Sequence, residues 1–172
     1  EGKQELSKWK NNDNKKQSVN AVILDGLWLC VSRDTMDKIS FDESSFSGFH
    51  CYDSDICMQV RDLNREPRII FDILIEHFSL GTRNKLWLKN IFLFYKKWKK
   101  QLPACTIELS EDKISQANYK NALELIEQSR INKFGFQYSI KIIFIFLFAK
   151  STFSKRDLKY FYFLIIKSFS NN

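Results

Sequence analysis

The chain has 172 residues, a length that suits one compact domain, and with 44% hydrophobic and 27% charged residues it is not disordered throughout. Five glycines and two prolines exclude collagen-like and Pro/Gly-rich low-complexity proteins. The charge is unevenly spread: residues 131–172 hold seven Lys and Arg against one acid, whereas 20 basic and 19 acidic residues nearly cancel over 1–130. Because the net charge of +7 belongs to one segment rather than to the whole surface, nucleic-acid binding is disfavoured.

The polar start of the chain and its cysteines indicate in which compartment of the cell the protein is expected. Residues 1–19 predict a frayed segment, and residues 1–18 contain no apolar stretch of the kind found in signal peptides. Four cysteines without a CxxC pair predict free thiols in a reducing compartment. The longest uninterrupted apolar run, residues 142–149, is far shorter than the ~20 residues of a membrane-spanning helix. We therefore expect a cytoplasmic protein that does not span the membrane.

The first apolar segment, residues 21–31 (AVILDGLWLCV), is rich in residues that favour strands. A run this apolar predicts a strand that is buried on both faces. Asp25 and Gly26 interrupt the run, and such an interruption indicates a close backbone approach or a bound ligand. An ion pair of Asp25 with an arginine such as Arg33 or Arg68 is an equal alternative.

A single helical turn is expected over 34–39, and the loop FDESSFSGFH then leads to a helix over 52–65. The apolar residues of that helix recur at i, i+4 and i+7, which places them on one face. Asp53 and Asp55 lie in its first turn, where the helix dipole favours acidic side chains. Helix capping alone is therefore one explanation of these two residues.

The next elements alternate between strand and helix. Residues 68–76 (RIIFDILIE) predict a second strand that ends at His77. Helices are expected over 83–101, where six lysines would form a solvated face opposite an aromatic side, and from 110 to about 129. The order of strand, loop, helix, strand and helices is α/β in character.

Residues 131–172 combine basic and aromatic side chains, with 12 of the 26 aromatic residues of the chain. Apolar runs at 142–149 and 160–166 alternate with lysines. Their composition favours strands, helices in a membrane interface are an open alternative, and read-through of AT-rich sequence is a third. Because such side chains suit the headgroup region of anionic lipids, we expect this tail to contact a membrane surface, and ordinary packing in the core is the alternative.

Five short motifs follow one another between residues 20 and 100, namely DGLWLCVSRD, FDE, GFHCYDSDICMQV, ILIEHFSLG and NKLWLKNIFLFYKKW. In this order and spacing they resemble the second half of an inverting, family 2-type glycosyltransferase domain of the GT-A fold. More narrowly, they are similar to the bacterial branch associated with surface polysaccharide synthesis. The resemblance implies an incomplete GT-A-like α/β half domain over 20–130 with added C-terminal helices, preceded by the polar segment 1–19 and followed by the basic aromatic tail 131–172.

The resemblance also implies roles for individual residues. Asp53 matches the general base of such enzymes, and Asp55 matches the second acid of the same junction. His77 matches the histidine that helps to hold a divalent metal, Mn or Mg. Asp25 and Gly26 match the polar-Gly step that lines the donor and acceptor pocket, with Trp28 close by. This chemistry is coherent, because inverting sugar transfer needs a carboxylate to deprotonate the acceptor and a cation to neutralise the leaving diphosphate.

The chain departs from the family in one large respect, since the first half that binds the nucleotide is absent from the sequence. We expect a partial glycosyltransferase that transfers a sugar from a nucleotide-sugar donor to a glycan acceptor with inversion, located in the cytoplasm and peripherally at the inner membrane face. Whether the chain is catalytic alone stays open. The alternative is a non-catalytic membrane-surface or protein-interaction module that acts through 131–172. A zinc site at Cys51, Cys57, His50 and His77 is disfavoured, because their spacing matches no established pattern.

Overall fold

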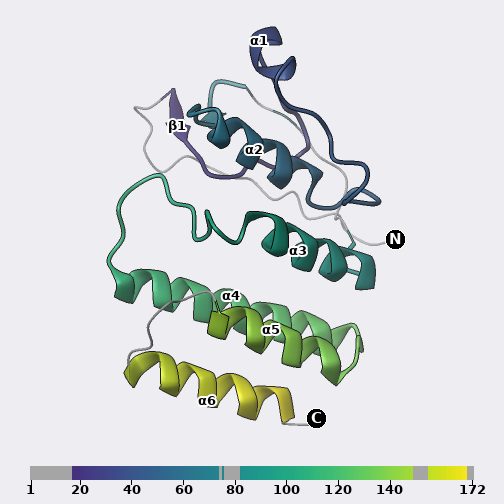
Figure 1. Cartoon of the computed structure of the whole chain (residues 1–172), viewed down its shortest axis with the longest axis vertical. Coiled ribbons are helices and arrows are strands. Elements are labelled where there is room, and N and C mark those ends of the chain that lie inside the picture. Colours follow the sequence, from purple (N-terminus) through teal and green to yellow (C-terminus); the bar gives the residue numbers. More distant parts are fainter. Residues whose placement is uncertain (1–16, 74, 76–81, 149–154, 170–172) are drawn as a thin grey trace.

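The computed structural model describes residues 17–73, 75, 82–148 and 155–169. The protein is a mixed α/β structure that is mostly helical and has a small sheet. Figure 1 shows its elements stacked along the long axis, with α1 and α2 at one end, α3 in the middle, and α4, α5 and α6 at the other end. In chain order the elements are β1 Ser18–Asn20, α1 Arg33–Met36, α2 Tyr52–Asp62, β2 Arg68–Ile70, α3 Lys85–Trp98, α4 Glu111–Ile131, α5 Phe136–Phe148 and α6 Lys155–Phe169.

The sheet consists of β1 and β2, paired antiparallel with Ser18 opposite Ile70 and Asn20 opposite Arg68. The expected buried strand over 21–31 is wrong, because the chain leaves the sheet after Asn20 and Trp28 is 54% exposed. A strand is buried on both faces only when layers cover both sides of a larger sheet, and two short strands cannot provide that setting. The second predicted strand is confirmed only at its start.

The helices begin close to the predicted positions because local capping signals specify their first turns. Ser32 precedes α1 and its Oγ accepts a hydrogen bond from the Thr35 backbone N–H at 3.3 Å. Asn84 caps α3 in the same way, its Oδ1 accepting from the Trp87 N–H at 2.9 Å. Ser110 stands before α4, whose first turn carries two acids.

The tail, for which strand and helix were both open, forms the helices α5 and α6. Its buried residues pack in the main apolar core together with residues of α3 and α4, and α6 lies against α4 and α5. The apolar core therefore contains residues from both sides of the expected boundary between 20–130 and 131–172. The core consists of Leu88, Ala122, Ile126, Phe134, Ile142, Ile143 and Leu164.

Helix α3 joins this core to the N-terminal part of the protein. Leu88 of α3 is fully buried within the core, whereas Trp98 at the end of the same helix is buried against α2. Between them, the buried Asn90 side chain donates to the Ser47 carbonyl at 2.9 Å. The loop that leads to α2 is thereby attached to the same helix as the core, so α3 positions the candidate site.

Candidate functional site

The structure brings Gly26 and Asp53 together, although 27 residues separate them in the sequence. The Gly26 N–H donates to Asp53 Oδ2 at 3.0 Å, and the Tyr52 hydroxyl donates to the Gly26 carbonyl at 3.1 Å. A Cβ atom at Gly26 would lie 2.1 Å from Tyr52 Oη, so only glycine fits without a shift of the ring. The two sequence motifs DG and YDSD thus form one local structure.

Asp53 is held in the first turn of α2 by backbone donors. Its Oδ1 accepts from the Ser54 N–H at 2.7 Å, in addition to the bond from Gly26 to Oδ2. Helix capping therefore explains the bond of Asp53 within α2 but not its bond to Gly26. A carboxylate oxygen has two lone pairs, and Oδ1 also accepts from the Ser54 hydroxyl at 3.3 Å, so Oδ2 of this half-buried group is the oxygen that can still accept a further proton or hydrogen bond.

The residue before α2, Cys51, has a left-handed backbone with φ of 64° and makes no side-chain cap. This conformation costs a non-glycine residue about 1–3 kcal/mol and recurs where geometry serves function. Burial, followed by the charges of Asp53 and Asp55, raises the pKa of the Cys51 thiol to about 12. The thiol is therefore protonated at neutral pH and is not a nucleophile.

The start of α2 lies in an acidic environment. Burial raises the pKa of the Tyr52 hydroxyl, and the negative charges of Asp53 and Asp25 raise it further. Asp25 therefore acts on the same ring that contacts Gly26. The side chains of Asp25 and Trp28 are exposed to solvent. Of the expected site residues, Asp25, Gly26 and Asp53 are thus grouped around Tyr52.

The residue expected to bind a metal ion is His77. His77 lies outside the described residues, so its predicted role stays a prediction. Within the ranges that the structure describes, no three His, Cys, Asp or Glu side chains are arranged to hold a metal ion. The described residues alone therefore do not make the metal site that the resemblance implies.

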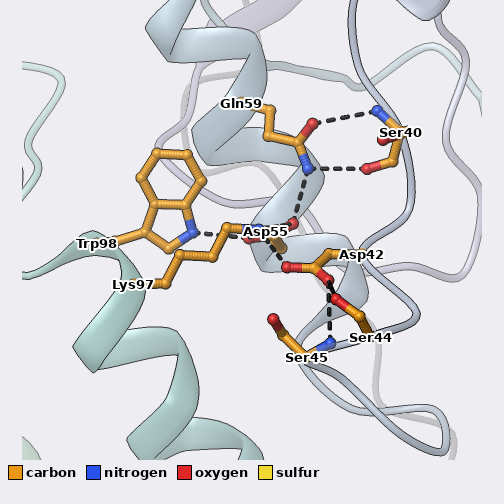
Figure 2. A network of polar contacts seen from close by, with 8 residues as sticks. All are labelled: Ser40, Asp42, Ser44, Ser45, Asp55, Gln59, Lys97 and Trp98. Atoms are coloured by element: carbon orange, nitrogen blue, oxygen red, sulfur yellow. Dashed lines mark hydrogen bonds and ion pairs between the residues drawn. The ribbon is translucent and has the colours of Figure 1, made fainter.

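The expectation that Asp55 lines the substrate pocket is wrong, because its side chain is buried in a polar network. Its side chain is 1% exposed, and Figure 2 shows it enclosed by protein donors. Trp98 Nε1 donates to Oδ1 at 2.7 Å, Lys97 Nζ donates to Oδ2 at 3.0 Å, and Gln59 Nε2 donates to Oδ2 at 2.7 Å. A buried carboxylate is tolerated only with such partners, and here they attach α2 to α3.

Lys97 extends this network to the loop before α2 (Figure 2). Its Nζ lies 2.7 Å from Asp42 Oδ2, and the hydrogen bond from Lys97, followed by those from Ser44 and Ser45, holds the pKa of Asp42 well below its usual range. Burial lowers the pKa of the Lys97 ammonium, but its bonds to Asp42 and Asp55 outweigh that effect and raise it overall. The solvated-face expectation is therefore wrong for Lys97, whose side chain is 31% exposed.

An open hollow of about 650 Å³ lies over this network. None of the residues expected from the sequence to form the site lines it. One lining residue, Phe41, packs against Tyr52 with ring centroids 6.1 Å apart, which links the hollow to the start of α2. The lining residues are Ser40, Phe41, Asp42, Glu43, Ser44, Gln59 and Lys97.

Sequence reasoning missed three residues that organise the site, namely Tyr52, Asp42 and Lys97. Tyr52 and Asp42 stand inside the quoted motifs GFHCYD and FDE, which was the available signal. Lys97 had no such signal, since it is one of six lysines within residues 83–101 and its partners are 42 and 55 residues away.

The arrangement has a definite chemical capacity. A half-buried carboxylate that is oriented by two backbone N–H groups can accept a proton from a hydroxyl group that approaches it. Comparisons of the chain with models of protein families, with curated proteins and with solved structures found no match.

Proposed function

We propose that the chain is the acceptor-side half of an inverting, GT-A-type glycosyltransferase domain, with Asp53 as its general base. The observation that carries the proposal is the hydrogen bond from the Gly26 N–H to Asp53 Oδ2. Two motifs that resemble the same enzyme family, 27 residues apart, meet at this bond. Helix capping by itself would not require a contact with the DG step.

In this proposal Asp53 removes the proton from the acceptor hydroxyl as the oxygen attacks the anomeric carbon of the donor sugar. The bond to the nucleotide diphosphate breaks on the opposite face, which inverts the configuration. Asp25 offers a carboxylate to sugar hydroxyls, and the exposed indole of Trp28 offers an apolar surface to a sugar ring. The network around Asp55 keeps the first turn of α2 in place, which makes Asp55 a positioning residue.

The nucleotide-sugar donor would be bound by a further domain or partner chain, at the cytoplasmic face of a membrane. The resemblance assigns a Mn or Mg ion to His77, where the metal would neutralise the leaving diphosphate. Because the described residues do not form a metal site by themselves, the step proposed here rests on the carboxylate alone.

The proposal is tested with Asp53→Asn, which keeps the shape of the side chain but removes its basicity. The control is Asp72→Asn, which removes an exposed carboxylate just after β2. We expect Asp53→Asn to lower kcat for sugar transfer by about 10²–10⁴-fold while the Kd for the donor stays unchanged. Both are measured on the chain combined with the domain or partner that binds the donor, transfer with nucleotide-sugars and Mn and donor binding by isothermal titration.

Two outcomes would contradict the proposal. If the chain combined with the domain or partner that binds the donor supports no transfer in the presence of Mn, this chain supplies no working acceptor site. If transfer occurs but Asp53→Asn and Asp72→Asn have the same rate, Asp53 is not the base.

A further inference from the structure

Helices α5 and α6 expose a row of large apolar side chains, which we call the aromatic face. Its members are 37–64% exposed. Within each helix most of them recur at intervals of three or four residues, which places them on one side. The two rows meet where Phe136 packs against Phe169, with ring centroids 4.7 Å apart. The aromatic face consists of Phe136, Ile140, Phe144, Leu158, Tyr162, Phe163, Ile166 and Phe169.

This face is separate from the apolar core that the same helices form. Ile142 of α5 and Leu164 of α6 are 1% and 0% exposed, and both belong to the core. Each helix is thus apolar on its core side and again on its outer side. Exposed large apolar side chains that gather in this way are typical of a binding surface, since contact of apolar area with water is unfavourable.

The charges around the aromatic face are positive. Lys141, Lys155, Lys159 and Lys167 are exposed, and Lys159 Nζ lies 5.9 Å from the ring centroid of Phe163. The single acid of the two described helices, Asp157, is 0% exposed and accepts a hydrogen bond from Ser115 of α4. A partner must therefore be both apolar and anionic.

These properties favour an anionic lipid surface over other occupants. A second copy of the chain would bring lysines against lysines, which is unfavourable. Nucleic acid would satisfy the lysines but would leave Leu158 and Ile166 without apolar contacts, because its outer surface is phosphate. Lipid headgroups over acyl chains meet both needs, since aromatic side chains settle at that boundary and lysines bind lipid phosphates.

A second hollow, of about 430 Å³, adjoins the aromatic face between α3 and α5. Phe144 belongs to both, and Lys96 and Lys141 line the hollow together with apolar side chains. A phosphate between two lysines with an acyl chain on aromatic rings fits this composition. Among the helices that the structure describes, none has the length and apolar character to cross a bilayer.

We propose that α5 and α6 lie flat on an anionic phospholipid surface through the aromatic face and its lysines. Figure 1 shows α6 at the end of the molecule opposite α1, with α3, α4 and α5 between α6 and α2. This binding does not depend on sugar transfer.

The test is flotation of the full chain with phosphatidylcholine vesicles, with and without phosphatidylglycerol. We expect binding to the anionic vesicles that weakens as salt is raised. Lys141→Gln with Lys159→Gln should reduce partitioning about 30-fold, at about 1 kcal/mol for each lysine near an anionic surface. Leu158→Gln with Ile166→Gln should reduce it by about tenfold or more, because exposed apolar area no longer enters the lipid.

Matched controls lie outside the face. Lys99→Gln with Lys100→Gln removes the same charge at the end of α3, and Ile107→Gln removes an apolar side chain that is 69% exposed between α3 and α4. Circular dichroism shows that each variant keeps its helices. Three results would overturn the proposal: equal binding to both kinds of vesicle or to neither, equal effects of control and face variants, or a dimer in sedimentation that the face variants dissociate.

Discussion

The N-terminal region, residues 17–73, and the helical region α4–α6 differ in the polar contacts that they bury, although both contain fully buried apolar side chains, such as Met58 and Leu164. In the N-terminal region a buried carboxylate, a lysine and backbone amides connect the loop, α2 and α3, and apolar side chains such as Ile23 stay partly exposed. In the helical region the contacts are largely apolar, with Leu164 and Ile142 almost completely buried. The comparison teaches that buried apolar side chains stabilise both regions, whereas the polar network around Asp55 adds the geometry of the candidate site.

The largest effect is expected from Leu164→Ala, which opens a cavity in the helical region. Leu164 is 0% exposed, so the variant should lower the free energy of unfolding by about 2–5 kcal/mol. Leu158→Ala, on the same helix but 58% exposed, is the control and should cost about 1 kcal/mol or less. Urea denaturation followed by circular dichroism measures both, and equal losses would show that α6 does not pack as described.

A smaller loss is expected from Lys97→Met, which acts on the network of the N-terminal region. The variant leaves the Asp55 carboxylate buried without its cation, at a cost of about 1–3 kcal/mol. Lys89→Met removes an exposed lysine from the same helix and should change stability by less than about 0.5 kcal/mol. Indole fluorescence of Trp98, which donates to Asp55, should change in Lys97→Met but not in the control.

Gly26→Ala tests the contact that joins the two motifs. The added Cβ would meet Tyr52 Oη at 2.1 Å, so we expect a loss of about 1–3 kcal/mol and displacement of Asp53. In the double variant with Tyr52→Phe, the closest atom is removed and the two losses should be less than additive. Additive losses in a double-mutant cycle measured by urea denaturation would show that the ring and the glycine are not in contact.

The smallest expected effect is a change of the free energy of unfolding with pH, which arises from Asp42. The pKa of Asp42 is held below its usual range in the folded chain, chiefly by Lys97, so the unfolded chain binds the proton first. The stability that this carboxylate contributes is present above its unfolded pKa of about 3.9 and is lost as the pH falls below that value. Asp42→Asn should therefore show a shallower loss of stability in acid than the natural chain, measured by urea denaturation between neutral and acidic pH, whereas the apolar contacts of Leu164 do not titrate.

Local signals in the sequence determined most of the helices. The spacing of Ile56, Val60 and Leu63 and the helix start at Ser110 need only neighbouring residues to act, and α1, α2, α3 and α4 were predicted within a few residues of their bounds. Gly26 and Asp53 were also singled out by their motifs, although their hydrogen bond was not.

Only the tertiary structure decided the remaining features. Residues 21–31 have the composition of a buried strand, but no larger sheet exists in the described structure to cover them, and they lie partly exposed beside α2. The tail has strand-forming composition, yet packing against α4 makes it helical. Asp55 changed from an expected pocket residue to a buried anchor because Trp98, 43 residues away, folds against it. Burial and pairing depend on residues distant in sequence, whereas caps and helical spacing depend on neighbours, and that difference separates what the sequence determined from what the fold decided.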